Sequence, residues 1–266
     1  MCRLAELSRA SFYRYWGEHA PREHDTELRD RIQQLALADR HCGYRRIHAL
    51  LRRQGWVVNR KRVLRLMRED NLLSLRKRAF VVTTEARHPW RLYPNLARGL
   101  QVTGVNQLWV ADITYVRLRE EFVYVSVVLD AYSRRVIGWS LNRHLHAEVA
   151  LAALRMALEE RALTGALVHH SDRGVQYACQ DYVTLLEAHN ITPSMSRVGN
   201  PYDNAKAESL IKTLKTEQLD ARRWASLDEL RQGLKQFFDY YNQRRLHSAL
   251  DYQSPVEFEA AGRNNK

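Results

Sequence analysis

Hydrophobic residues recur at helical spacing near the start of the chain. Leu28, Ile32 and Leu35 follow one another at intervals of four and three residues, which predicts an amphipathic helix. With Asn59 as an N-cap and Gly55 as a C-terminal stop, the same pattern predicts helices over residues 27–38, 44–54 and 60–70. The sequence therefore predicts a small all-α domain of three short helices over residues 21–74.

The hydrophobic pattern changes after residue 101. Runs rich in β-branched and aromatic residues predict strands over residues 108–116, 122–129, 136–141, 166–170 and 191–195. Helical patterns predict helices over residues 147–161, 180–188, 203–219 and 227–242. Three antiparallel strands followed by alternating helices and strands indicate an α/β domain with a mixed five-stranded sheet flanked by helices, as in the ribonuclease-H-like fold. We expect this domain over residues 101–262.

Two further segments lack such patterns. Residues 1–20 are interpreted as an N-terminal helical extension. Residues 75–100 contain Pro89, Pro94 and a basic cluster at 76–78, and are interpreted as a basic linker that can itself lie along DNA.

Charge is distributed unevenly along the 266 residues. The net charge is +12, and residues 1–100 hold all of it, with 22 Lys and Arg against 10 Asp and Glu, whereas the remainder holds 20 of each. This asymmetry indicates that the first part meets a polyanion; nucleic acid is favoured over a membrane surface or ribosomal RNA. The three helices with a basic last one then resemble a DNA-binding helix-turn-helix, and a solvated basic face on a helical bundle is the alternative.

Composition excludes several other classes of protein. No apolar run is long enough to span a bilayer, and the N-terminus lacks the apolar stretch of a signal peptide, so we expect no membrane partner and a cytoplasmic, nucleoid-associated location. Three widely spaced cysteines, Cys2, Cys42 and Cys179, fit neither a disulfide framework nor a zinc pattern, and we interpret them as reduced thiols.

A carboxylate interrupts the first predicted strand. By alternation, Asp112 shares a strand face with Val110 and Thr114, where an apolar residue is expected. Burying an unpaired carboxylate is costly, so the position needs a cation, a partner or open solvent. The alternative interpretation is that Asp112 lies on an edge strand and is exposed to solvent.

Two more acidic residues follow in the second half of the chain. Asp172 comes just after the strand at 166–170, where open α/β sheets bind ligands, although S-D-R-G can also be a plain turn. Glu208 lies on a predicted helix, where about 100° per residue puts Lys212 and Lys215 on its face. Ordinary surface ion pairs are the alternative for that face.

Carboxylates from separate elements suit divalent metal ions. Mg²⁺ prefers carboxylate oxygens and keeps positions open for water and phosphate. Two such ions about 4 Å apart activate an attacking oxygen and stabilise a leaving one in a phosphodiester displacement. Asp112, Asp172 and Glu208 therefore predict a site that cuts and joins phosphodiesters with two Mg²⁺ ions, for which Mn²⁺ can substitute.

Ordered motifs carry a resemblance to a known family. They are V-A-D-I-T-Y at 110–115, H-S-D-R-G-V-Q-Y at 170–177, S-x-x-G-N-P-Y-D-N-A-x-A-E-S at 196–209 and Y-N-x-x-R-x-H-S-A-L at 241–250. With G-Y-R-R-I at 43–47, they resemble the OrfB-type transposases of bacterial insertion sequences, relatives of retroviral integrases with a DDE catalytic core. The resemblance covers about residues 21–260 and is carried by several motifs in order, including 35 residues between the second and third carboxylates.

The resemblance implies an activity and a set of site residues. It implies that Asp112, Asp172 and Glu208 are the metal-binding catalytic triad, and that the protein binds element-end DNA, cleaves a strand to leave a 3′-OH and joins that end to target DNA. The loop leading into the catalytic helix would comprise Gly199, Asn200, Pro201 and Asp203 to Ala205. The predicted DNA-binding residues are Lys215, Lys212, Arg60, Lys61, Arg62, Arg65, Arg45 and Arg46.

The resemblance also has limits and alternatives. Retroviral integrases carry a His/Cys zinc module at the N-terminus, whereas this chain has a helix-turn-helix pattern there. Family members often act fused to or with an upstream-frame DNA-binding protein, so this chain can be the catalytic half of a longer polypeptide. Because transposition acts on two ends, we expect a homo-oligomer, at least a dimer, on DNA. A DNA-binding regulator with a silent core and a plain ribonuclease-H-type nuclease are the alternative functions.

Other residues have weaker claims to a site. Asp130 competes for the place of the first carboxylate, but D-A-Y-S-R favours an Asx-type turn. His169 and His170 flank Asp172 and can contact metal or a base, although a helper or packing role is favoured. Trp90, Tyr93 and Trp109 can stack on unpaired bases, or can pack in the core or the linker. Tyr241, Arg244, Arg245 and His247 can contact the DNA backbone, or can cap the last helix.

Overall fold

The computed structural model describes residues 25–73, 90–119, 121–197, 204–220 and 222–264. The chain divides into two compact units, Met1–Arg76 and Lys77–Lys266. The predicted extension at 1–20 and the basic cluster at 76–78 lie outside the described residues.

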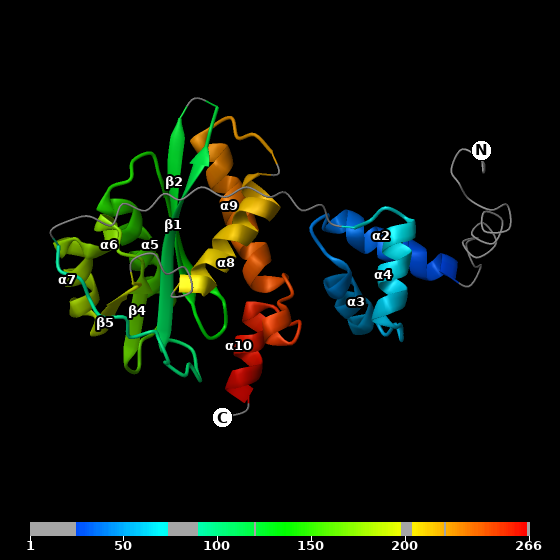
Figure 1. The fold of residues 1–266 in the computed structure, drawn as a ribbon, viewed down its shortest axis with the longest axis horizontal. Helices are drawn as coiled ribbons and strands as arrows, with labels where there is room; N and C mark the ends of the chain where they lie inside the picture. Colours follow the sequence, from blue (N-terminus) through cyan, green and yellow to red (C-terminus); the bar gives the residue numbers. More distant parts are fainter. Residues whose placement is uncertain (1–24, 74–89, 120, 198–203, 221, 265–266) are drawn as a thin grey trace, which may run out of the picture. The chain divides into compact units, whose positions relative to one another are not determined.

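Three helices form the described part of the first unit: α2 (Thr26–Ala38), α3 (Tyr44–Arg53) and α4 (Arg60–Glu69) (Figure 1). Their apolar stripes meet in one buried core that includes Ile32, Ile47 and Leu66. The Asn59 side chain accepts a hydrogen bond from the Lys61 backbone N–H at 2.8 Å, which caps α4, and Gly55 has φ +85° just after α3. The three helices predicted from the sequence are therefore confirmed.

A mixed five-stranded sheet forms the centre of the second unit. Its strands are β1 (Leu108–Arg117), β2 (Phe122–Asp130), β3 (Val136–Asn142), β4 (Leu167–Ser171) and β5 (Ile191–Met195), in the spatial order β3-β2-β1-β4-β5. β1, β2 and β3 are antiparallel neighbours, whereas β4 runs parallel to β1 and β5 parallel to β4. The predicted fold class is confirmed, and the strand that carries Asp112 is the central one.

Helices cover both faces of the sheet, because alternate side chains of the strands feed two separate cores. On one face, α5 (Ala147–Glu160), α6 (Val175–Ala178) and α7 (Gln180–Ala188) pack with Trp109 and Ala111 of β1. On the other, α8 (Ala205–Leu214) and α9 (Leu227–Gln243) pack with Leu108 and Val110 (Figure 1). By alternation, Asp112 belongs to the face that α8 covers.

The catalytic-helix region departs from the sequence prediction. Instead of one helix over 203–219, α8 ends at Leu214 and the chain continues as a π-helical turn, η3 (Lys215–Leu219). The wider turn buries Leu219 in the core and holds Glu217 against Arg245. The Lys215 N–H still donates to the carbonyl oxygen of Ile211, four residues back, so Lys215 keeps the helical spacing that was predicted to place it on the face of Glu208.

Two C-terminal elements were not predicted from the sequence, a 3₁₀ turn, η4 (Ser248–Leu250), and the helix α10 (Pro255–Asn264). Residues 90–100 form neither helix nor strand, and the Leu96 N–H donates to the Ser194 hydroxyl at 2.8 Å, so this end of the expected linker packs on the core. Of the helices described, none has the length and apolar character needed to cross a membrane.

Candidate catalytic site

Parallel pairing of two strands brings the two candidate aspartates to the same level of the sheet. Val110 of β1 pairs with His170 of β4, and the preceding pairs keep the same offset of 60 residues. Continuing this register places Asp112 beside Asp172, the first residue after β4. Asp112 is half-buried, and the Asp172 carboxylate accepts the Gly174 N–H at 2.9 Å. The predicted strand-end position of Asp172 is thus confirmed.

The helix that carries Glu208 is anchored directly beside Asp112. The Asn204 side-chain amide donates to the carbonyl oxygen of Ala111 at 2.9 Å, and the Lys206 ammonium donates to the carbonyl oxygen of Ala131 at 2.7 Å. Four apolar residues of α8 are buried on the sheet: Ala207, Leu210, Ile211 and Leu214. Glu208 itself is exposed, so α8 presents its carboxylate to solvent from a helix whose start is tied to β1.

Like charges act on one another at this site. Burial raises the pKa of the Asp112 carboxyl to about 7, and the negative charges of Asp172 and Glu208 contribute to the increase. The Ile113 N–H and the Lys215 ammonium oppose it. Burial also raises the pKa of Glu208 above its usual value. The three carboxylates are therefore close enough to disfavour their joint ionisation, a conflict that a cation would relieve.

The donor set suits a hard divalent cation in its chemistry, because three carboxylates arrive from β1, the end of β4 and α8. The Asn204 Oδ1 atom beside them is buried with no hydrogen-bond partner in the described part of the chain. Across the same residues, no three His, Cys, Asp or Glu side chains converge as a ready-made metal cage.

Comparison with known proteins places this chain in a family. Family models described as integrase core domain match residues 102–201 and 189–255, and one described as HTH-like domain matches residues 23–80. The chain is 36% identical over 264 residues to the "insertion element IS600 uncharacterized 31 kDa protein" of Shigella sonnei, with 97% of each chain covered. It is 33% identical over 266 residues to "transposase InsF for insertion sequence IS3A" of Escherichia coli (strain K12), with 97% of this chain and 92% of the relative covered. The chain belongs to the insertion-sequence transposase family.

Solved structures agree with this fold. A chain in the structure of the "simian T-cell lymphotropic virus intasome in complex with PP2A regulatory subunit B56 gamma" aligns over 86% of this chain and 74% of its own length, with 14% identity and a TM-score of 0.52. The transposase-family chain therefore shares the integrase-type, ribonuclease-H-like architecture that its sequence motifs implied.

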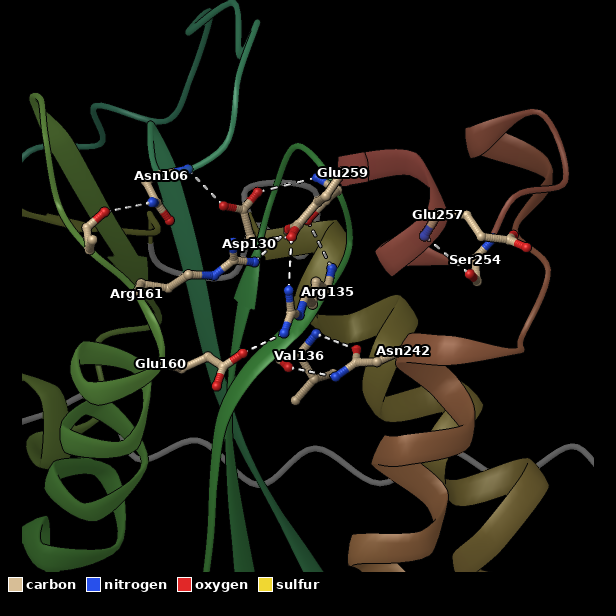
Figure 2. Close-up of polar contacts among 12 residues, drawn as sticks. Asn106, Asp130, Arg135, Val136, Glu160, Arg161, Asn242, Ser254, Glu257 and Glu259 are labelled. Carbon is tan, nitrogen blue, oxygen red and sulfur yellow. Dashed lines mark hydrogen bonds and ion pairs between the residues drawn. The ribbon is translucent and has the colours of Figure 1, made fainter. Parts of the chain in front are cut away.

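Asp130, the competing carboxylate of this transposase core, holds a turn. It is fully buried, and its oxygens accept the backbone N–H groups of Tyr132, Ser133 and Asn106 at 2.8–3.2 Å. Figure 2 shows Asp130 facing Asn106 across the end of the sheet. The predicted Asx-type turn is confirmed.

A second acidic group lies near that turn. Glu259 of α10 is buried, pairs with Arg161 and Arg135, and accepts the Ser133 hydroxyl at 2.6 Å (Figure 2). Glu160 pairs with the same Arg135. We call Glu160, Glu259, Arg135 and Arg161 the α10 clamp, because their opposite charges tie α10 to the β2–β3 turn and to the end of α5.

The two histidines beside Asp172 are packed into the transposase core. The His169 ring is buried and hydrogen-bonds the Tyr182 hydroxyl at 3.0 Å, and burial lowers its pKa to about 3, with a further contribution from His170. His170 lies between the hydroxyls of Ser194 and Ser196, at 2.8 and 3.0 Å. The His169 ring therefore ties β4 to α7, and the His170 ring ties β4 to β5, next to the strand end that carries Asp172.

Most of the aromatic and C-terminal candidates are also structural. Trp109 is fully buried, and Tyr93 is partly buried against the same core, whereas Trp90 is exposed. Tyr241 is buried, and the His247 ring packs edge-on against it with 4.8 Å between ring centroids. Arg245 forms its ion pair with Glu217 at 2.8 Å, and Arg244 is the C-cap residue of α9. Packing or ion pairing accounts for all of these except Trp90 and Arg244, whose side chains are exposed.

The predicted DNA-binding residues of the first unit fall into two groups. Arg62 and Arg65 of α4 form ion pairs with Asp25, which is fully buried, so they hold the helices together. Burial would raise the pKa of Asp25, but hydrogen bonds from these two guanidiniums outweigh it and lower the pKa. Arg60, Lys61 and Arg45 are exposed, and Arg46 is half-buried with its guanidinium donating to the His41 carbonyl oxygen.

The loop predicted to lead into the catalytic helix is only partly described. Gly199, Asn200, Pro201 and Asp203 lie outside the described residues. Within the described part, the roles of Asn204 and Lys206 as anchors of α8 were not predicted. A local pattern cannot reveal them, because the carbonyl groups that they bind are 93 and 75 residues away along the chain.

Proposed function

We propose that this chain is a DNA transposase of the DDE type, which hydrolyses a strand at the end of its insertion element and transfers the resulting 3′-OH to target DNA. The observation that supports it most is the raised pKa of Asp112, caused by burial and by the charges of Asp172 and Glu208. In the α10 clamp, by contrast, hydrogen bonds from Arg161 and Ser133 outweigh burial and lower the pKa of Glu259.

In the proposed mechanism, Asp112, Asp172 and Glu208 hold divalent metal, two Mg²⁺ ions or Mn²⁺ in their place. When bound, the metal supplies Lewis-acid activation of the attacking oxygen and neutralises charge on the leaving oxygen. Strands β1 and β4 fix the aspartates through their backbone pairing, while α8 presents Glu208. Lys215, near enough to lower the pKa of Asp112, would hold a phosphate oxygen beside them.

Both proposed steps are displacements at phosphorus. In the first, water gives up a proton and forms a new P–O bond as the P–O3′ bond at the element end breaks, and the released 3′ oxygen takes up a proton to become a 3′-OH. In the second, that 3′ oxygen forms a bond to a target phosphorus, and the target 3′ oxygen leaves with a proton. No Ser, Cys or His nucleophile is needed, in accord with the buried, neutral His169.

DNA contacts and assembly belong to the same proposal. Lys212 and Lys215 would bind the element end, and Arg60, Lys61, Arg45 and Arg46 would contact the DNA backbone, while Arg62 and Arg65 would reach phosphate only alongside their pairing with Asp25. We propose a homo-oligomer on paired ends, acting with or fused to an upstream-frame DNA-binding protein. Sedimentation that finds one protomer per paired-end complex would contradict the oligomer.

The proposal is tested with the purified chain and DNA that carries the inverted repeats flanking its gene. With Mg²⁺, wild type should nick the end and join it to target DNA. Asp172→Asn should lower both rates by about 10³-fold or more, which corresponds to about 4 kcal/mol of lost transition-state stabilisation. Glu160→Gln, in the α10 clamp, is the matched control and should retain activity.

Three outcomes would contradict the proposal. Strand transfer by Asp172→Asn at the wild-type rate would show that the three carboxylates are not the catalytic residues. DNA binding without nicking in Mg²⁺ or Mn²⁺ would favour a regulator with a silent core. Hydrolysis of RNA–DNA hybrids without joining of ends would favour a plain nuclease.

A further inference from the structure

Aromatic rings and cations alternate in a row beyond Asp112. The Lys215 ammonium lies 4.8 Å from the centre of the Tyr115 ring, and that ring lies 5.7 Å from the ring of Phe122, nearly perpendicular to it. The Arg117 guanidinium carbon lies 5.7 Å from the centre of the Phe122 ring on the far side of the row. We call Lys215, Tyr115, Phe122 and Arg117 the ring row.

The sheet register explains why the row is accessible. Arg117 pairs with Phe122 across the β1–β2 ladder, so their side chains share one face, and Tyr115 joins it by alternation. The neighbouring residues Val116 and Val123 point to the opposite face and are buried in the core beneath α8 and α9. β1 pairs with β4 only over Leu108–Val110, so in the described structure the β1 edge beyond Asp112 is not covered by β4.

The exposure of Phe122 is the unusual feature. Its side chain is 48% exposed at the start of a strand, although a phenylalanine gains most from burial. The preceding residue, Glu121, pairs with Arg143 at 3.2 Å, so its charge is offset locally. Lys215 and Arg117 remain as the cations that flank the two rings.

Rings flanked by cations indicate the chemistry of the ligand. An aromatic ring stacks on a nucleobase of any sequence, and a neighbouring Lys or Arg binds the phosphates on either side of that base. A free phosphate has no base that could stack on the rings, so the rings would not contribute to its binding. A base inside a duplex presents no open face, so the ligand must be an unpaired nucleotide.

We propose that the ring row binds an unpaired nucleotide of the DNA strand adjoining the scissile phosphate, with the base stacked on Phe122 and its edge against Tyr115, and its flanking phosphates on Arg117 and Lys215. This inference rests on the proposed function and deepens it, because Lys215 joins the row to the carboxylate site. It assigns to the β1–β2 hairpin the task of holding the end of the element open.

Binding of end DNA that carries 2-aminopurine in the flanking strand tests the inference. The full chain is mixed with this DNA in EDTA, so that no cleavage occurs, and stacking is read as quenched fluorescence. Wild type should quench the probe and prefer DNA with unpaired flanking nucleotides over flush duplex. Phe122→Leu, which keeps an apolar side chain, should lose the quenching and weaken binding of the unpaired form about fivefold or more.

Two further variants make the test specific. Phe122→Trp should restore the quenching, because it restores a ring. Val105→Ala removes another exposed apolar side chain, 37% exposed and located before β1 begins, and should behave as wild type. Circular dichroism should match across all variants. Equal quenching by Phe122→Leu and wild type, or equal affinity of wild type for flush and unpaired ends, would overturn the inference.

Failure of this inference can be told apart from failure of the proposed function. If wild type transfers strands and Phe122→Leu quenches the probe as wild type does, the ring row does not bind the nucleotide, and the transposase activity is supported. If wild type quenches the probe in a way that depends on the Phe122 ring but never nicks DNA, the ring row binds the nucleotide and the proposed transposase activity is wrong.

Discussion

Two groups of carboxylates in the second unit differ in the charges that surround them. In the α10 clamp, Glu259 meets Arg161 and Arg135, and hydrogen bonds from Arg161 and Ser133 outweigh burial and lower its pKa. At the candidate site, burial and neighbouring carboxylates raise the pKa of Asp112. The first arrangement favours the ionised form and stabilises the fold, whereas the second stores electrostatic repulsion that ligand binding can release.

The comparison teaches that burial of an acid does not mark a site by itself. Asp130 is more buried than Asp112, yet it accepts three backbone N–H groups and shapes a turn. The sign of the surrounding charge separates the two kinds of acid. Three sets of measurements test this distinction.

Removing Glu259 should have the largest effect on stability. Glu259→Ala leaves the buried Arg161 without its partner, and we expect the free energy of unfolding to fall by about 3–5 kcal/mol in urea titrations. The control Glu160→Gln removes an exposed partner of Arg135 and should cost at most about 1 kcal/mol. Similar losses in the two variants would show that the clamp carries no special stability.

The two groups should respond to pH in opposite directions. Asp112 has a folded pKa of about 7, above its usual 3.8, so the folded state binds the proton more tightly and loses stability as pH rises from about 4 to 7. Asp112→Asn should therefore be more stable than wild type by about 1–3 kcal/mol at pH 8 in EDTA, and equal to it below pH 4.

In the α10 clamp, stability should change with pH in the opposite direction. The folded pKa of Glu259 lies below its usual 4.5, so its contribution is present above that pH and is lost as pH falls through the lowered value. Urea unfolding from pH 3 to 8 measures both effects. A difference between Asp112→Asn and wild type that does not grow with pH would contradict the assignment, and added Mg²⁺ should reduce that difference by stabilising wild type alone.

The smallest expected effect concerns two cations of the first unit, one exposed and one paired with a buried carboxylate. Lys61→Ala removes an exposed cation, so DNA affinity should weaken and the slope of log affinity against log salt should fall by about 1, with stability changed by about 0.5 kcal/mol or less. Arg62→Ala should instead lower stability by about 1–2 kcal/mol, because it removes a partner of the buried Asp25. Fluorescence anisotropy at several salt concentrations and thermal unfolding check the pair. Equal stability of the two variants would place Arg62 with the exposed cations.

Local signals explain why so much of the fold could be predicted. Periodicity and the Asn59 cap lie within a few residues of the helices that they define, and α3, α4 and α7 end within one residue of the predicted positions. The split of the predicted 203–219 helix could not be predicted, because the π-helical turn depends on Glu217 meeting Arg245, 28 residues further along. The candidate triad was found by motif and spacing.

The sequence by itself determined the order of helices and strands and the positions of Asp112, Asp172 and Glu208, since side-chain period and motif spacing are properties of the linear chain. Only the tertiary structure decided which charges meet. Ser133 reaches Glu259 across 126 residues, Arg62 reaches Asp25 across 37, and Tyr115 receives Lys215 from the π-helical turn. Whether an acid stabilises the fold or is available for chemistry depends on such partners, because electrostatic energy follows distance in space and solvent exposure.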